Sequence, residues 1–102
     1  MQEMLKNQIS ALGQSCGASC IILFGSRARG DNRERSDIDL AVYGLPEAQQ
    51  GNFCAGIDEL PTLLKFDIVF VDSFTSPTLL AEVERDGVIL YEAKKNKTKQ
   101  FY

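Results

Sequence analysis

The sequence contains no histidine among its 102 residues. This absence excludes catalytic triads built on histidine, acid–base chemistry by an imidazole, and zinc sites with imidazole ligands. Long apolar runs are also absent, because the longest, Cys20–Phe24, has the length of a strand and a membrane-spanning helix needs about 20 residues. The first four residues, MQEM, lack the basic segment and apolar stretch of a signal peptide. We therefore expect a cytoplasmic protein that does not enter a membrane.

Cysteine is scarce, and the three residues Cys16, Cys20 and Cys54 form no CxxC pair. An odd number of cysteines without an export signal predicts reduced thiols that serve as small, partly buried apolar side chains. Since histidine is missing, these thiols cannot easily complete a tetrahedral metal site.

Positive charge is limited and unevenly placed. The chain carries a formal charge of −3 and has a pI of about 4.8, which argues against a broad nucleic-acid-binding surface. Four of the eleven basic residues lie in the last ten positions, whereas all fourteen acidic residues lie at or before Glu92. We expect one domain over residues 1–92 and a basic C-terminal tail over residues 93–102.

Four arginines are concentrated in one segment of the acidic body, namely Arg27, Arg29, Arg33 and Arg35. Such a cluster is typical of a local anion site, for example a phosphate site. A solvated surface loop has the same composition, so the arginines alone do not decide between the two interpretations.

Apolar periodicity predicts a small α/β domain with about four strands and three helices. The helical pattern covers residues 3–12, with Gly13 as the stop, then 47–60, and finally a segment from the Ser76–Pro77 cap to Asp86. Short β-branched or alternating runs predict strands over 19–24, 37–42, 66–71 and 88–91. Gly51 and Gly56 weaken the helix prediction for 47–60.

Three acidic residues occur inside the predicted strands. Asp37 and Asp39 are two positions apart, so their carboxylates project from the same face of a strand, within about 7 Å of each other. The two charges repel, and a bound divalent cation relieves the repulsion because carboxylate oxygens are the preferred ligands of Mg²⁺. Asp67, the single acid in a later apolar strand, faces the same cation if the two strands are neighbours. Taken alone, the aspartate pair also fits ordinary charges at a strand edge.

A glycine–serine pair ends the first predicted strand and precedes what resembles the first turn of a helix. Gly25 allows the backbone to approach a ligand, Ser26 offers a hydroxyl, and the N–H groups at a helix start attract an anion. Together with the arginines and the aspartate pair, this arrangement describes both halves of a nucleoside triphosphate site. One half holds phosphates and the other half holds the metal that bridges them.

The string GSRARGDNRERSDIDLAV, residues 25–42, resembles the signature of the DNA polymerase β-type nucleotidyltransferase superfamily, with ten residues between the Gly-Ser pair and the D-x-D pair. It is similar to the minimal nucleotidyltransferases, the small MNT proteins of bacteria and archaea. The resemblance implies a polymerase β-like nucleotidyltransferase fold, in which a small mixed sheet of about four strands is flanked by helices.

The resemblance also implies a role for each residue of the motif. The triphosphate of ATP would be bound at the end of the first strand, by Gly25, Ser26 and Arg27 or Arg29. Two Mg²⁺ ions would be ligated by the acids, namely Asp37, Asp39 and Asp67. Asp67 would also help to deprotonate the attacking hydroxyl. The ions would support an in-line attack on the α-phosphorus, with pyrophosphate as the leaving group.

Proteins of this kind are often encoded beside a helical HEPN-domain ribonuclease toxin and act as its antitoxin. In some pairs they transfer AMP from ATP to a tyrosine of the toxin. The resemblance therefore implies a HEPN-domain toxin, or another helical protein that binds the acceptor, as a partner. Larger family members carry an extra helical domain for the acceptor, so we expect a partner chain or a homodimer to supply that surface. We do not expect DNA synthesis, because the chain is acidic and too short to hold a template.

Two further functions stay open at the level of sequence. The chain can neutralise a toxin by occlusion, as a binding module without catalysis. It can also form the nucleotide-binding half of a two-chain transferase that acts on a small molecule. A variant that lacks both Asp37 and Asp39 separates catalysis from occlusion, because only catalysis requires these carboxylates.

Overall fold

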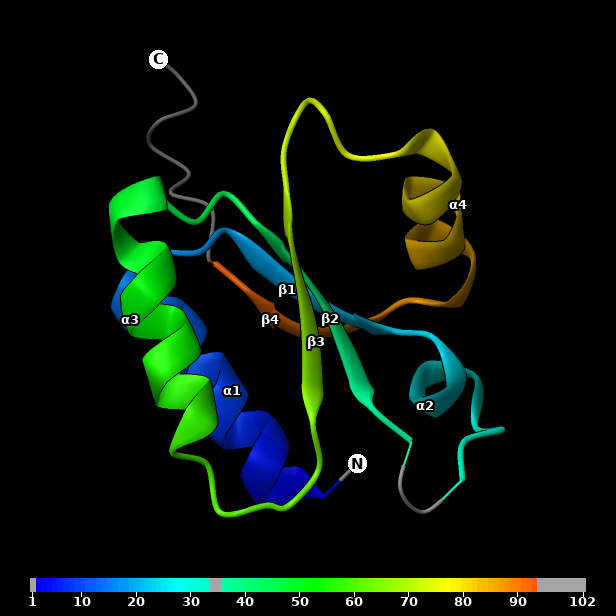
Figure 1. Ribbon diagram of the computed structural model, residues 1–102, viewed down its shortest axis with the longest axis horizontal. Helices are drawn as coiled ribbons and strands as arrows, with labels where there is room; N and C mark the ends of the chain where they lie inside the picture. The colour runs from blue at the N-terminus through cyan, green and yellow to red at the C-terminus, as the bar shows by residue number, and fades with distance from the viewer. Residues whose placement is uncertain (1, 34–35, 94–102) are drawn as a thin grey trace.

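The computed structural model describes residues 2–33 and 36–93 as one four-stranded mixed sheet with helices on both faces (Figure 1). The elements follow one another as α1 (Glu3–Cys16), β1 (Cys20–Phe24), α2 (Ser26–Arg29), β2 (Ile38–Tyr43), α3 (Glu47–Asp58), β3 (Phe66–Val71), α4 (Pro77–Asp86) and β4 (Val88–Glu92). The strand order is β3-β2-β1-β4. Strand β1 is antiparallel to β2 and β4, and β2 is parallel to β3, so the predicted small mixed sheet is confirmed.

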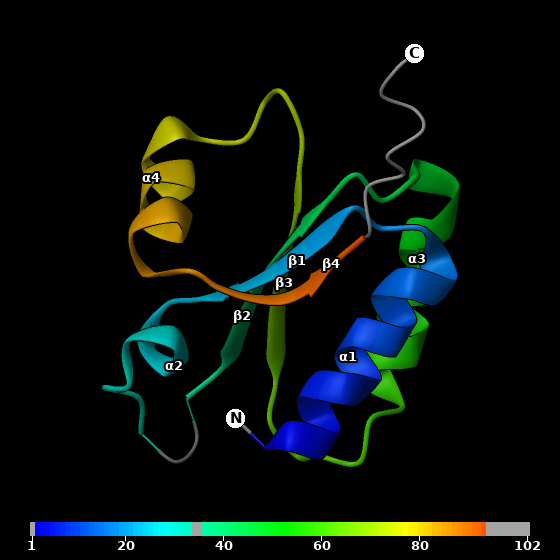
Figure 2. The ribbon, with the colours of Figure 1, turned by 180° about the vertical axis from the view of Figure 1, so that it is seen from behind.

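Helices α1 and α3 cover one face of the sheet, and α2 and α4 lie at the other (Figures 1 and 2). The face covered by α1 and α3, called here the α1/α3 face, holds the main core. Its fully buried side chains include those of Ile9, Ile21, Leu40 and Phe53. The α2/α4 face holds a smaller buried cluster, formed by Phe24, Ala41 and Val83.

The course of α1 differs from the sequence prediction. Gly13 does not end this helix but lies buried inside it, and the helix continues to Cys16 and ends at Gly17, whose φ is 89°. A Cβ atom at Gly13 would lie 2.6 Å from Cδ1 of Ile21 and 3.1 Å from Cδ2 of Tyr91. The prediction was wrong because this glycine lets the helix approach the sheet closely, which apolar periodicity does not reveal.

Most other elements follow the predictions. Strand β3 has the predicted bounds, and α3 forms in spite of its two glycines, although it ends at Asp58. Helix α4 begins as predicted, because the Ser76 hydroxyl accepts hydrogen bonds from the backbone N–H groups of Thr78 and Leu79 at 3.2 and 3.4 Å. Strand β2 begins at Ile38, one residue later than predicted.

The three cysteines are free thiols, one buried and two partly exposed, as the sequence predicts. No helix within residues 2–33 and 36–93 is long and apolar enough to cross a membrane. Except for Ala93, the predicted basic tail lies outside the described residues, and so does Arg35 of the arginine segment.

Candidate functional site

The sheet register brings two of the predicted acids side by side. Strands β2 and β3 are parallel, and Asp39 is directly paired with Asp67. The neighbours of Asp39 in β2, Ile38 and Leu40, belong to the core of the α1/α3 face. Because side chains alternate along a strand, Asp39 projects from the opposite face, where α2 and α4 lie. The condition stated from sequence, that the two strands be neighbours, is met.

The predicted glycine lies against the same carboxylate. Phe24, the last residue of β1, is paired with Asp39 across the antiparallel β1–β2 ladder, and Gly25 follows it. Gly25 is buried and has φ 79° and ψ −156°, a conformation that essentially only glycine adopts. A Cβ atom at this position would overlap Oδ2 of Asp39. Glycine is therefore required here both by the backbone conformation and by the close approach of Asp39.

Ser26 begins the four-residue helix α2 directly after Gly25, as the sequence suggested. The Gly25 carbonyl accepts hydrogen bonds from the backbone N–H groups of Ala28 and Arg29, both at 3.1 Å. Gly30 ends the helix with φ 86°. Ser26 is partly exposed and directly follows Gly25, which lies against Asp39.

The neighbouring acids raise the proton affinity of Asp39. The pKa of Asp39 lies above its ordinary value, first because the group is partly buried, then because of the negative charges of Asp67, Asp37 and Glu82. The positive charge of Arg29 acts in the opposite direction. The third predicted acid, Asp37, is exposed and lies immediately before β2. All three predicted acids therefore contribute to one concentration of negative charge at this end of the sheet.

The chemistry of these donors fits a hard divalent cation, because carboxylate oxygens are the ligands that Mg²⁺ prefers and their mutual repulsion favours a bound cation. In their present orientations, however, no three His, Cys, Asp or Glu side chains of the described residues converge to hold a metal ion. The backbone register supplies the proximity of Asp39 and Asp67, and side-chain rotations would be needed to complete a coordination shell.

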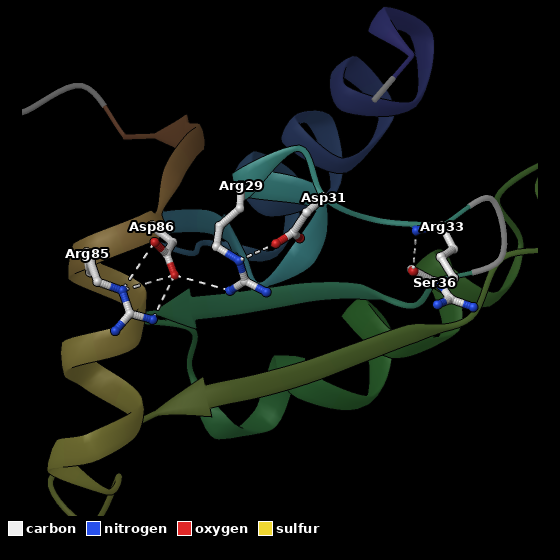
Figure 3. A network of polar contacts seen from close by, with 6 residues as sticks. All are labelled: Arg29, Asp31, Arg33, Ser36, Arg85 and Asp86. Atoms are coloured by element: carbon white, nitrogen blue, oxygen red, sulfur yellow. Dashed lines mark hydrogen bonds and ion pairs between the residues drawn. The ribbon is translucent and has the colours of Figure 1, made fainter.

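The two candidate phosphate-binding arginines have different surroundings. Arg27 is partly buried, and its Nε donates a hydrogen bond to the Ser36 carbonyl at 3.0 Å, which joins α2 to the segment before β2. Arg29 donates from Nε to Oδ2 of Asp31 at 3.1 Å and from Nη1 to Oδ2 of Asp86 at 3.3 Å (Figure 3). The positive charge of Arg29 also lowers the pKa of Asp39, so this side chain lies beside the acidic cluster.

Three residues of this region were missed by the sequence analysis. Glu82 and Asp86 come from α4, and Asp31 follows α2. Asp86 is separated from Arg29 by 57 positions. In the sequence, Asp86 indicates only the end of a helix, because it precedes Gly87. Nothing in the sequence pattern shows that α4 returns to α2, because that contact depends on the packing of both helices against one sheet face.

The comparison with protein families gives a match over residues 7–96 to the family described as polymerase beta, nucleotidyltransferase. This chain belongs to that family. The family match and the mixed sheet confirm the polymerase β-like nucleotidyltransferase fold expected from residues 25–42. A search of curated protein sequences gave no significant match.

Solved structures of similar fold include minimal nucleotidyltransferases and toxin–antitoxin complexes. A candidate minimal nucleotidyltransferase is 30% identical with a TM-score of 0.62, over 84% of this chain and 92% of that one. A chain of a toxin–antitoxin crystal structure with AMP-PNP is 26% identical with a TM-score of 0.65, over 87% and 74% of the two chains. A structure of the tri-AMPylated Shewanella oneidensis HEPN toxin in complex with MNT antitoxin matches at 24% identity and a TM-score of 0.61, over 91% and 74%. This last likeness shows the fold alone.

Proposed function

We propose that this nucleotidyltransferase transfers AMP from ATP, with Mg²⁺, to a hydroxyl group of a partner protein in the cytoplasm, and that the partner is a HEPN ribonuclease toxin which it neutralises. The observation that carries the proposal is the contact of three motif residues at one end of the sheet. Asp39 is paired with Asp67 and lies against Gly25, whose conformation only glycine adopts.

The phosphate-binding half of the site lies at the end of β1. Gly25 brings the backbone close to a ligand, and Ser26 offers a partly exposed hydroxyl at the start of α2. Arg29 supplies a fixed positive charge beside the acids, which suits an anion that approaches a cluster of carboxylates. The AMP-PNP bound to a related toxin–antitoxin structure supports ATP as the nucleotide.

The metal-binding half is formed by Asp37, Asp39 and Asp67, which would hold Mg²⁺ through their carboxylate oxygens. Bound Mg²⁺ would neutralise charge on the phosphates and polarise the α-phosphorus. Asp67 is exposed, so its carboxylate is accessible to an incoming hydroxyl and can accept its proton. The sequence has no histidine to act as this base, and Asp67 is an exposed carboxylate whose charge acts on Asp39.

The acceptor would come from another chain. Asp37 and Asp67 are exposed and Ser26 is partly exposed, so the site opens onto the surface rather than into an enclosed cleft. A protein substrate can dock on such a surface and present a hydroxyl side chain. The toxin–antitoxin complexes among the structures of similar fold support a HEPN protein as this partner. We further propose that residues 1–92 form the catalytic domain and that residues 93–102 form a basic tail.

Labelled transfer tests the proposal directly. The chain is incubated with ATP labelled in the α-phosphate, MgCl₂ and a HEPN-domain partner protein, and label on each protein is followed. We expect labelled HEPN protein with the wild type and none with Asp37→Ala/Asp39→Ala. The matched control is Asp58→Ala, which removes an exposed carboxylate from α3 on the other face of the sheet and should label normally.

Three outcomes would contradict parts of the proposal. Label that persists in Asp37→Ala/Asp39→Ala would show that these acids are not the catalytic residues. If the double variant protects cells from the toxin as well as the wild type does, neutralisation occurs by occlusion. Label on a small-molecule hydroxyl, and none on protein, would favour the two-chain small-molecule transferase.

A further inference from the structure

Asp86 links two helices that are far apart in the sequence. It is the last residue of α4, and its side chain is only 11% exposed. Its carboxylate accepts hydrogen bonds from Nη2 of Arg85 at 2.9 Å, from Nε of Arg85 at 3.3 Å, and from Nη1 of Arg29 at 3.3 Å. Figure 3 shows Asp86 between the two guanidinium groups. One carboxylate therefore ties the end of α4 to α2.

Arg29 is held along only part of its guanidinium group. Asp31 accepts from Nε and Asp86 accepts from Nη1, whereas Nη2 makes no hydrogen bond to any described residue. An arginine has five N–H donors, so most of them remain available to a ligand. The side chain is 38% exposed and its charge acts on Asp39. Arg29 is thus fixed by two acids while a free edge stays accessible beside the catalytic carboxylates.

The hydrogen bonds of Arg29 to Asp31 and Asp86 favour a side chain that is already ordered for phosphate binding, rather than one for which the two acids compete with phosphate. A free arginine at the surface must lose rotamer freedom when it binds a phosphate, which weakens binding. Here the two carboxylates order the side chain in the absence of ligand. The hydrogen bonds that Asp86 accepts from Arg85 and Arg29 lower its pKa. The carboxylate is therefore charged at neutral pH and accepts the hydrogen bond from Arg29. If the acids instead competed with phosphate for Arg29, their removal would strengthen nucleotide binding.

We propose that Asp86 is a positioning residue, which holds Arg29 in the orientation that binds the triphosphate of ATP. The inference rests on the proposed function and extends it to a residue of α4 outside the sequence motif. It assigns α4 a role in nucleotide binding, through the contact between Arg29 and Asp86, which lie 57 positions apart in the sequence.

A double-mutant cycle on the full chain tests the inference. The affinity for ATP with Mg²⁺ is measured by calorimetry for the wild type, Asp86→Asn, Arg29→Ala and the double variant, together with KM and kcat for labelled transfer. We expect Asp86→Asn to raise the dissociation constant and KM by about 5- to 10-fold, the range of a lost charge-assisted contact, with kcat changed far less. In the Arg29→Ala background, Asp86→Asn should cause no further loss.

Arg85→Ala is the matched control, because it removes the exposed arginine that also contacts Asp86 and leaves the Arg29 contact in place. We expect its dissociation constant to stay within about 2-fold of wild type. Thermal unfolding of each variant checks folding, and Asp86→Glu replaces Asp86→Asn if the latter does not fold. That variant retains the charge with the carboxylate displaced by one methylene, and we expect a smaller loss.

Three results would overturn the inference. Unchanged or tighter ATP binding by Asp86→Asn shows that Asp86 does not position Arg29 for phosphate. An equal loss in the presence and absence of the Arg29 side chain shows that Asp86 acts on the structure of α4 alone. If the wild type itself binds no ATP, the proposed function has failed, and the inference fails with it. This last result is distinguishable from the other two, in which the wild type binds.

Discussion

Among residues 2–33 and 36–93, the α1/α3 face of the sheet buries twelve residues in one apolar cluster, whereas the α2/α4 face buries three. The same strands supply both sets. In β2, for example, Leu40 and Val42 enter the larger cluster and Ala41 the smaller. At one end of the α2/α4 face, where β1 ends and β2 and β3 begin, the apolar side chains give way to Asp39 and Asp67.

The α1/α3 face mainly stabilises the fold, whereas the α2/α4 face carries the candidate functional site. Burial of apolar surface on the α1/α3 face stabilises the fold, since each buried methylene contributes about 0.8 kcal/mol. The α2/α4 face carries like charges close together, which disfavour folding when no ligand is present. One well-packed face can therefore compensate for a second face whose composition suits a ligand rather than a core.

The largest effect should follow from a cavity in the well-packed face. Phe53 is fully buried in α3 and packs edge-on against Phe70, with ring centroids 6.3 Å apart. Phe53→Ala should lower the free energy of unfolding by about 3–5 kcal/mol in urea titrations. Val83→Ala, at a buried position of the α2/α4 face, removes less apolar volume and should cost about 1–2 kcal/mol. Equal losses would contradict the division between the two faces.

A pair of glycine substitutions should separate stability from activity. Gly25→Ala places a Cβ atom against Asp39 in a backbone conformation that alanine avoids, so we expect a loss of about 1–3 kcal/mol and at least about a 10-fold loss of transfer activity. Gly13→Ala crowds Ile21 in the core of the other face and should cost about 1–3 kcal/mol in stability.

The two variants are compared at a temperature at which both are folded, by urea titration and by labelled transfer with the HEPN protein. Gly13→Ala should then keep nearly the wild-type activity. If its transfer activity falls as far as that of Gly25→Ala, the contact between Gly25 and Asp39 has no special importance for catalysis.

The smallest expected effect is a pH-dependent change in stability at Asp39. Its pKa in the folded chain is raised above the ordinary value of 3.8, so its ionised form disfavours folding at neutral pH. Asp39→Asn should therefore raise the melting temperature by a few degrees at pH 7. The difference should shrink as the pH falls through the raised pKa and disappear below about pH 3.8, where the wild-type carboxyl is protonated in both states.

Thermal melts of the wild type and Asp39→Asn between pH 3 and pH 8, with and without MgCl₂, measure this effect. Mg²⁺ should raise the melting temperature of the wild type more than that of the variant, because the neutral amide is a weaker ligand. The exposed Glu84→Gln on α4 serves as the control, because it removes a carboxylate whose charge is not among those that raise the pKa of Asp39. A destabilised Asp39→Asn at pH 7 would show that the carboxylate is stabilised rather than crowded.

Local signals were sufficient to predict most elements and much of the candidate site. Ser76 and Pro77 marked the start of α4, and the apolar run 66–71 marked β3, because capping and strand patterning act between near neighbours in the chain. Gly25, Asp37 and Asp39 lie within eighteen residues of sequence and were found from their spacing. The stop predicted at Gly13 was wrong because a glycine is needed there to avoid a clash with Ile21 and Tyr91, which belong to other elements.

The sequence by itself determined the kind of chemistry open to this protein. A chain without histidine, with a Gly-Ser pair and a D-x-D pair ten residues apart, makes carboxylates the candidate catalytic groups, and local periodicity places these residues at strand ends. Only the tertiary structure decided which side chains meet. Asp39 lies beside Asp67 because β2 and β3 pair in parallel, and Arg29 meets Asp86 because α2 and α4 share one face of the sheet. Such contacts depend on strand order and helix packing, which arise from burial across the whole chain rather than from any local pattern.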